Sequence, residues 1–142
     1  MIQSSIQFTL LNEMRMAIVS LILTNNRIAE QAGLHTTDMQ LLQLIETNTD
    51  VTPKMLSDIT GITTGGITVV LDRLEKKNLI ARRAHPTDRR RVIVVLGPLK
   101  ERKKLQDAYA DITKDTFEMM SRYSDKELAV IADFFSNIKN IK

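Results

Sequence analysis

The sequence contains no cysteine and no tryptophan, and it has only five glycines and three prolines among 142 residues. The lack of cysteine excludes disulfides, thiolate nucleophiles, thiolate metal sites and cysteine-based redox sensing, and it fits a reducing compartment. Because glycine and proline are few and 43% of the residues are hydrophobic, the chain suits one compact domain, or a domain with a dimerisation element, better than a disordered polymer.

Two further absences concern location and metals. The longest uninterrupted apolar run is about as long as a strand, and no basic region leads into a hydrophobic segment at the N-terminus. We therefore expect no membrane span, no secretion and a cytoplasmic protein. His35 and His85 are the only histidines, too few for a His-rich metal site, so we expect neither a metal nor a cofactor.

Catalytic patterns are also lacking. No Ser-His-Asp or Cys-His arrangement can be nominated, and most carboxylates fall on predicted helix surfaces beside a basic residue, as solvated charges do. A glycine pair before a helix can form a nucleotide-binding loop, but Gly65 and Gly66 follow no predicted strand and precede no G-K-[ST] motif. We therefore predict that the protein is not an enzyme.

Positive charge is concentrated in one third of the chain. Residues 61–104 contain 12 Lys/Arg and 4 Asp/Glu, a net charge of +8, whereas the remainder has a net charge of −5. A basic block is often only a solvated face, but one confined to a single predicted substructure makes a polyanion such as DNA a candidate partner.

The outer segments are predicted amphipathic helices. The first covers about residues 5–27, a long helix runs from Pro98 to about Arg122, and the last begins at a capping box of Ser124 and Glu127. The first and last helices have apolar stripes with steps of 3, 4 and 3 residues: Leu11, Met14, Ile18, Leu21, and Leu128, Ile131, Phe135, Ile138. These faces need to be covered by one another or by a partner.

The central segment is predicted to contain three short helices. The motif "TDMQ" at residues 37–40 suggests a capping box for the first, which should end near Asn48. Thr52 and Pro53 start the second, and Gly61 can end it with a positive φ.

Thr63 can cap the third central helix, and Asn78 can end it in the left-handed region. Its buried stripe is predicted to be Ile67, Val70, Leu71 and Leu74. Two helices joined by a tight, glycine-containing turn are typical of a helix-turn-helix.

A β-hairpin is predicted next, with strands at about residues 79–84 and 91–96 and the loop "HPTDRR" between them. A helix-turn-helix followed by a hairpin is a winged helix. The predicted fold is therefore mainly α with a small β-hairpin wing: a winged helix-turn-helix flanked by N- and C-terminal dimerisation helices.

The stretch "LSDITGITTGGITVVLDRLEKKNLIARRAHPTDRRRVIVVL" resembles the DNA-binding core of the MarR family of bacterial transcription regulators, and the flanking helices fit the family's order. The specific matches are the D-x-R wing signature at Asp88 and Arg90 and the helix ending "DRLEKKNLI", although family members usually have glycine at the position of Asn78. "TTGG" at residues 63–66 resembles one subgroup.

The resemblance implies a homodimer whose outer helices form the dimer interface and whose two winged helices read a pseudo-palindromic operator in double-stranded DNA. The expected division is an N-terminal dimerisation helix at 1–34, the DNA-binding domain at 35–97 and C-terminal dimerisation helices at 98–142. The resemblance also suggests a pocket for a small aromatic or anionic effector. Tyr109 and Tyr123 are the only tyrosines in a chain without tryptophan, so few side chains can stack on an aromatic effector.

The N-terminus of the third central helix presents free amides, hydroxyls and little side-chain bulk, which permits close approach to phosphates or base edges. Its glycines reduce helix stability, so either DNA contact or tight packing against the neighbouring helix should compensate. The predicted recognition-helix contacts are Thr63, Thr64, Gly65, Gly66, Thr68 and Arg73.

The hairpin tip is the second predicted contact. Arg89 and Arg90 can enter a minor groove, where narrow A·T tracts concentrate negative potential, and Asp88 can hold an arginine by a charge-assisted hydrogen bond. The resemblance assigns the insertion chiefly to Arg90, with Asp88 as its brace. Other cations of the block are predicted phosphate contacts or solvated charges, with a solvated surface favoured for three of them: Arg82, Arg83 and Lys77.

The functional hypothesis is a dimeric, sequence-specific DNA-binding regulator, a repressor released by a small effector. The alternative is a winged-helix module that binds protein and does not read DNA sequence. The arginine-rich tip argues against this alternative, because protein-binding surfaces more often expose apolar anchors.

Overall fold

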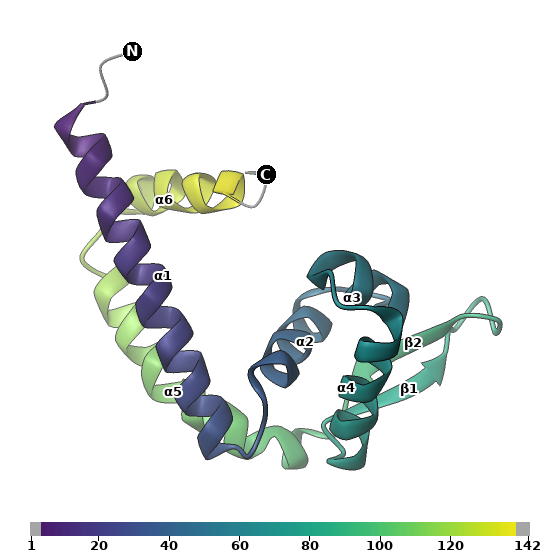
Figure 1. The fold of residues 1–142 in the computed structure, drawn as a ribbon. Helices are drawn as coiled ribbons and strands as arrows, with labels where there is room; N and C mark the ends of the chain where they lie inside the picture. Colours follow the sequence, from purple (N-terminus) through teal and green to yellow (C-terminus); the bar gives the residue numbers. More distant parts are fainter. Residues whose placement is uncertain (1–3, 139–142) are drawn as a thin grey trace. The chain divides into compact units, whose positions relative to one another are not determined.

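The computed structural model describes residues 4–138, which contain six helices and one two-stranded sheet (Figure 1). By backbone contacts the chain divides into two compact units, Met1–Leu105 and Gln106–Lys142. The predicted fold class, mainly α with a hairpin wing, is confirmed. The functional boundaries predicted after residues 34 and 97 stay a prediction.

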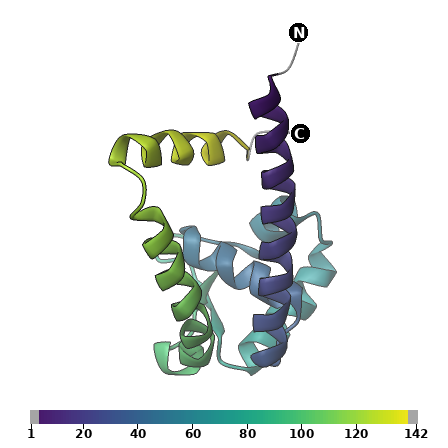
Figure 2. The ribbon, with the colours of Figure 1, turned by 90° about the vertical axis from the view of Figure 1, so that its left-hand side faces the viewer.

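Helix α1 (Ser5–Gln31) is one continuous rod that extends four residues beyond its predicted end at Arg27 (Figures 1 and 2). Only Ile28 and Ala29, near its C-terminal end, are buried. By length and composition α1 could also cross a membrane, since an 18-residue window of it has a mean hydropathy of 1.4. The length of the longest uninterrupted apolar run does not reveal this, because a few polar residues divide the window. One such helix is weak evidence for a membrane span.

Helix α2 (Thr36–Thr47) begins two residues earlier than the predicted capping box at residues 37–40 requires, so that prediction was wrong. His35 is the N-cap, and the Asp38 carboxylate accepts a hydrogen bond of 2.9 Å from the His35 backbone N–H. Asp38 offers a charged acceptor at the third helical position, and a carboxylate there also interacts favourably with the helix dipole.

Helices α3 (Pro53–Thr60) and α4 (Thr64–Lys76) start and stop where the sequence predicts. The Thr52 hydroxyl accepts from the Met55 N–H, and the Thr63 hydroxyl accepts from the Gly66 N–H. Gly61 and Asn78 both adopt left-handed φ values, +72° and +56°. Local capping chemistry therefore determines the turn of the helix-turn-helix.

The core of the winged helix lies where α2, α3, α4 and the hairpin meet. All four residues of the predicted α4 stripe are buried, and three of them are completely buried: Ile67, Leu71 and Leu74. Leu41 of α2 and Leu56 of α3 are also completely buried. Full burial of a leucine or isoleucine side chain contributes about 1.5–3 kcal/mol. This burial determines which face of α4 is left for solvent.

The wing is an antiparallel pair, β1 (Ile80–Ala84) and β2 (Val92–Leu96), in which Ile80 lies opposite Leu96. β2 is also tied to the loop before α3, because the Val94 N–H donates to the Val51 carbonyl at 2.7 Å. Behind the hairpin, a Cβ on Gly97 would lie 2.0 Å from the Asn78 carbonyl oxygen. Only glycine lets the end of β2 pass this close to the end of α4.

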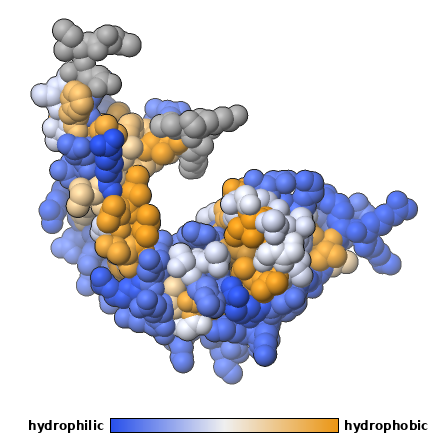
Figure 3. Space-filling model, in the orientation of Figure 1, coloured by the Kyte–Doolittle hydropathy of each residue, from blue (hydrophilic) through white to orange (hydrophobic). Residues whose placement is uncertain are grey.

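Helix α5 (Leu99–Met120) and helix α6 (Asp125–Ile138) contain no buried residue in the part of the chain that the structure describes. The predicted capping box of α6 is confirmed, with the Ser124 N–H donating to the Glu127 carboxylate at 2.8 Å. Hydrogen bonds from Ser124 lower the pKa of Glu127. The predicted apolar stripe of α6 is exposed or half-exposed, as are many apolar residues of α1, some of which are visible in Figure 3.

Candidate nucleic-acid interface

The solvent-facing side of α4 is formed by small and hydroxyl-bearing residues near its N-terminus. Thr63, Thr64, Gly65 and Thr68 are exposed. The Thr68 hydroxyl donates to the Thr64 carbonyl at 2.9 Å, which orients the side chain along the helix and leaves its oxygen lone pairs toward solvent as acceptors. Four of the six predicted recognition residues are therefore exposed near the N-terminus of α4, and Gly66 there is partly exposed.

The two glycines of α4 have different reasons to be glycine. A Cβ on Gly66 would lie 2.7 Å from Cγ2 of Ile62 and 3.3 Å from the Thr63 hydroxyl, so packing against the turn requires a small residue there. A Cβ on Gly65 would meet nothing within 4 Å. Of the two explanations that the sequence left open, packing accounts for Gly66 but not for Gly65.

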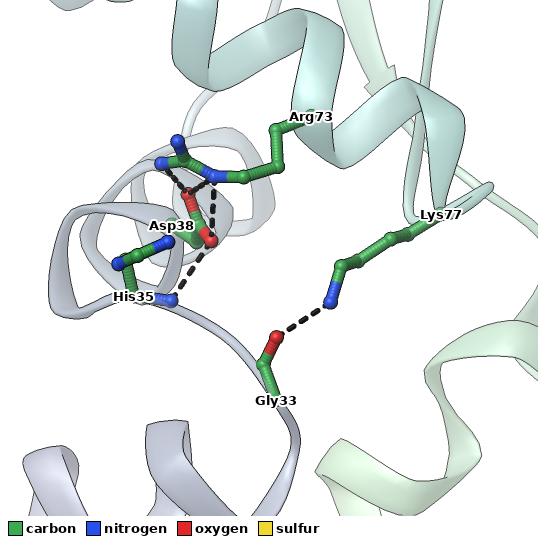
Figure 4. Close-up of polar contacts among 5 residues, drawn as sticks. All are labelled: Gly33, His35, Asp38, Arg73 and Lys77. Atoms are coloured by element: carbon green, nitrogen blue, oxygen red, sulfur yellow. Dashed lines mark hydrogen bonds and ion pairs between the residues drawn. The ribbon is translucent and has the colours of Figure 1, made fainter.

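Arg73 joins α4 to the start of α2 through a bidentate ion pair (Figure 4). Its Nε lies 3.0 and 3.1 Å from the two Asp38 carboxylate oxygens, and its Nη2 lies 2.5 Å from Oδ1. The Asp38 side chain is 0% exposed and that of Arg73 is 31% exposed. The hydrogen bond to Asp38 raises the pKa of Arg73, so the guanidinium remains charged.

Lys77, directly after α4, makes a second contact with the same region. Its Nζ donates a hydrogen bond of 2.5 Å to the Gly33 carbonyl in the connection between α1 and α2 (Figure 4). These two contacts attach the C-terminal end of α4 to residues 33–38. That segment connects α1 to α2 and contains the start of α2.

Arg82 on β1 fastens the wing to the opposite flank of α4. Its backbone N–H donates to Glu75 at 2.9 Å, and its guanidinium bonds Glu75 at 2.5 Å and Asp72 at 2.6 Å. The backbone hydrogen bond from Arg82 is the main cause of the lowered pKa of Glu75. The prediction of a solvated Arg82 was incomplete, because its guanidinium is held by two carboxylates of α4.

Sequence reasoning missed these contacts of α4. The residues of the Arg73–Asp38 pair are 35 positions apart and those of the Lys77–Gly33 contact are 44 apart, so no local periodicity reveals them. The predicted DNA contact of Arg73 stays a prediction, but in the free protein its Nε and Nη2 are engaged by Asp38.

At the wing tip, Asp88, Arg89 and Arg90 are exposed. The Asp88 carboxylate accepts a hydrogen bond of 3.1 Å from the backbone N–H of Arg90, and the Asp88 carbonyl accepts from the Arg91 N–H at 3.0 Å. Asp88 therefore braces the backbone of the turn. Both predicted arginine side chains extend from a turn whose backbone is fixed.

His85 organises the base of this loop, a role that the sequence did not indicate. Its side chain is 12% exposed, and its Nδ1 accepts from the backbone N–H groups of Thr87 and Asp88 at 3.3 Å. Its Nε2 lies 3.6 Å from a carboxylate oxygen of Asp50.

Comparison with known proteins agrees with this geometry. The sequence profile described as MarR family matches residues 32–91, which include α2, α3, α4, β1 and the wing loop. Two regulators of Bacillus subtilis (strain 168) match most of the chain. The uncharacterized HTH-type transcriptional regulator YcgE is 32% identical over 84% of this chain and 77% of its own length. The HTH-type transcriptional regulator MhqR is 30% identical over 80% of this chain and 77% of its own length.

The chain belongs to the MarR family. Solved structures share its fold at lower identity: MarR from Oenococcus oeni PSU-1 is 20% identical, with a TM-score of 0.65 over 93% of this chain and 99% of that one. A point mutant of MepR from a multidrug-resistant Staphylococcus aureus clinical isolate is 17% identical, with a TM-score of 0.75 over 99% of this chain and 98% of that one. As a MarR-family member the protein is a DNA-binding transcription regulator and not an enzyme.

The Arg73–Asp38 pair generates the first prediction. Replacing either residue with alanine leaves a charge without its partner, and we expect each change to lower the free energy of unfolding by roughly 2–3 kcal/mol, less than for a fully buried pair because Arg73 is partly exposed. Urea unfolding of both single variants and the double variant, at one protein concentration, measures the coupling between them.

Lys54→Ala is the matched control, because Lys54 pairs with Asp58 on the solvent side of α3 and both side chains are largely exposed. That change should alter stability by about 0.2–0.5 kcal/mol. A cost for Arg73→Ala no larger than for Lys54→Ala would show that the pair does not hold α4.

The second prediction concerns His85. His85→Ala removes the acceptor for the Thr87 and Asp88 N–H groups, and we expect DNA affinity to fall about 3- to 10-fold, the effect of one or two net hydrogen bonds. His85→Asn should restore most of the affinity, because an asparagine carbonyl can accept from the same backbone groups. Both variants should melt within a few degrees of the unchanged protein.

Fluorescence anisotropy with a duplex selected from a random-sequence pool provides the affinities. If the alanine variant binds as tightly as the unchanged protein, or if asparagine is as weak as alanine, His85 does not position the wing.

Proposed function

We propose that the protein is a homodimeric repressor that binds a pseudo-palindromic operator and is released by a small-molecule effector. The observation that carries the proposal is the exposed, low-bulk face at the N-terminus of α4, in the same basic segment as a braced arginine turn at the wing tip. A convex helix face suits the major groove, and an arginine on a narrow hairpin suits the minor groove.

The contacts proposed for α4 are hydrogen bonds of its hydroxyls and first-turn amides with base edges and phosphates, except that the Gly66 N–H is already bonded to the Thr63 hydroxyl. The residues are those predicted from the sequence: Thr63, Thr64, Gly65, Gly66 and Thr68. We assign Arg73 first to holding α4 in place, since its guanidinium is already bonded to a buried carboxylate.

At the wing we propose that Arg90 enters the minor groove, with Arg89 beside it. Asp88 fixes the turn through the Arg90 backbone N–H, which leaves the Arg90 guanidinium free to meet DNA. A turn whose backbone is already fixed loses less conformational freedom when it binds DNA.

A homodimer is proposed because the outer helices have apolar faces that call for a partner. Within α1, Ile18, Leu21 and Ile22 are about half-exposed, and Phe134 and Phe135 of α6 are 37% and 56% exposed. Exposed apolar surface of this extent marks an association site. A second copy would cover it and would supply the second winged helix that a palindromic operator requires.

Effector release is proposed on mechanical grounds. The two half-sites of such an operator lie about one turn of DNA apart, so the two recognition helices must have a matching spacing. An effector that binds a dimer with a different spacing more tightly than the matching one would release the DNA. An open groove of about 720 Å³ along α2 supports a small-molecule site, with a lining of amide, hydroxyl, carboxylate and apolar groups: Gln40, Gln43, Leu44, Glu46, Thr47 and Thr60. This lining suits an uncharged, hydrogen-bonding effector better than an anion.

A cytoplasmic location follows from the proposal, since a bacterial regulator of this kind meets its operator there. In this interpretation the apolar character of α1 serves dimerisation and not a membrane. Its exposed glutamate and arginine, Glu13 and Arg15, near the middle of the helix also fit a protein interface edge better than a lipid environment.

The third prediction tests the proposal with Arg90→Ala. We expect the protein to prefer a selected duplex with two half-sites over a scrambled duplex and over a duplex with one half-site. Log K should fall steeply with log salt, by about 0.9 per phosphate neutralised. Arg90→Ala should weaken specific binding by about 1–3 kcal/mol per half-site. Anisotropy across a salt series measures all three quantities.

Lys126→Ala is the control, since Lys126 is an exposed cation outside the basic block. It should leave affinity and salt slope unchanged. Equal, weak binding to every duplex that is indifferent to Arg90→Ala would contradict the proposal and would favour the protein-interaction module. A one-half-site duplex bound as tightly as the full site would contradict the dimeric mode.

A further inference from the structure

One apolar side chain on α4 is unused by the fold. Val69 is 60% exposed, although the helix buries Ile67, Val70, Leu71 and Leu74. It lies off that stripe, next to the exposed Thr68 and one turn after Gly65. The free protein thus presents a branched apolar group in the middle of the surface that is proposed to face DNA.

Gly65 leaves space next to this group. The residue is exposed, and a Cβ built on it would have no neighbour within 4 Å, so nothing in the described protein requires glycine there. Its φ is not in the left-handed region that would favour glycine. Residues at i and i+4 are neighbours on a helix surface, so Gly65 and Val69 together form a shallow notch beside a raised isopropyl group.

The flanking residues contribute oxygen acceptors and one further methyl. Thr68 precedes Val69, and its hydroxyl proton is directed to the Thr64 carbonyl at 2.9 Å. The charged neighbours on the next turn are directed elsewhere, because Asp72 is bonded to Arg82 at 2.6 Å and Arg73 to Asp38. Val69 is therefore the apolar group of the exposed α4 face between Gly65 and these paired charges, and Nε and Nη2 of Arg73 are already bonded to Asp38.

An apolar contact in the major groove has one specific target among the four bases. Thymine alone presents a methyl group, at C5, whereas the other base edges there offer mainly hydrogen-bond donors and acceptors. A valine side chain cannot satisfy a donor or acceptor, so it penalises the wrong base as well as favouring a methyl group.

We infer that Val69 is a specificity-determining residue that reads the C5-methyl group of a thymine in each half-site, and that Gly65 provides the clearance for that approach. This inference rests on the proposed DNA-binding function of α4. It makes thymine recognition at one position of each half-site independent of hydrogen bonds.

The test removes the methyl group from the DNA. The full chain is first used to select an operator from a random duplex pool, and each thymine of a half-site is then replaced by deoxyuridine, which pairs identically but lacks the methyl group. Anisotropy gives the dissociation constants for the unchanged protein and for Val69→Ala. Val92→Ala is the control, because Val92 is also an exposed valine of the winged helix but lies on β2.

The unchanged protein should lose about fourfold in affinity at one deoxyuridine position, and about fifteenfold when both half-sites are changed, which corresponds to one buried methyl group per half-site. Val69→Ala changes both subunits, so it should bind the thymine operator more weakly by a factor comparable to that for deoxyuridine in both half-sites. Its affinity should not change when deoxyuridine replaces thymine at that position. Val92→Ala should keep the full penalty. Gly65→Ala should not lower the melting temperature but should weaken binding to the operator.

Two results would overturn the inference while leaving the proposed function intact: a selected operator in which no deoxyuridine weakens binding, or an identical deoxyuridine penalty in Val69→Ala and the unchanged protein at every position. A selection that enriches no sequence, together with indifference to Arg90→Ala, would instead reject the proposed function and this inference with it.

Discussion

The ion pair between Arg73 and the buried Asp38 is the contact on which the placement of α4 depends. A carboxylate with 0% exposure is strongly destabilising without a cation, and Arg73 provides one with two engaged nitrogens. The same carboxylate accepts the His35 N–H at the start of α2. One side chain thus fixes where α2 begins and how α4 lies against it. Hydrophobic burial alone would tolerate small rotations of α4, but a bidentate pair restricts them.

Several charges of α4 are paired within the protein, and the side proposed to face DNA presents small residues, hydroxyls and one valine. Asp72 and Glu75 hold the wing through Arg82, and Lys77 holds the connection after α1. Of the 12 Lys/Arg in residues 61–104, Arg73, Lys77 and Arg82 are therefore engaged within the protein. In the proposed function the basic field attracts DNA over a distance, whereas sequence discrimination is left to hydroxyls, one exposed valine and the arginines of the wing.

Local signals made much of the fold predictable. Thr52 and Thr63 cap their helices, Gly61 and Asn78 stop them, and the stripe of α4 is buried as its spacing indicates. Each of these depends on residues within a few positions of one another. The start of α2 was misplaced, because Thr37 and Gln40 match a capping pattern more closely than His35 and Asp38, whereas Asp38 is held by a partner 35 positions away.

The candidate site was less accessible to sequence reasoning. Which residues of α4 face solvent follows from periodicity, but the use of Arg73, Lys77 and Arg82 as internal fasteners depends on tertiary contacts. The nearly buried ring of His85 shows why a loop histidine cannot be placed without its neighbours. Val69 could have been found from the sequence, since it is an apolar residue outside the predicted stripe.

NMR of the arginine Nε–Hε groups, free and bound to the selected operator, tests whether Arg73 serves to hold α4 in the proposed complex. We expect an Arg73 Hε resonance that exchanges slowly with water in the free protein and keeps its position on binding, while the Arg90 resonance shifts. An Arg73 resonance that exchanges rapidly when free, or that shifts as Arg90 does when DNA is added, would contradict it.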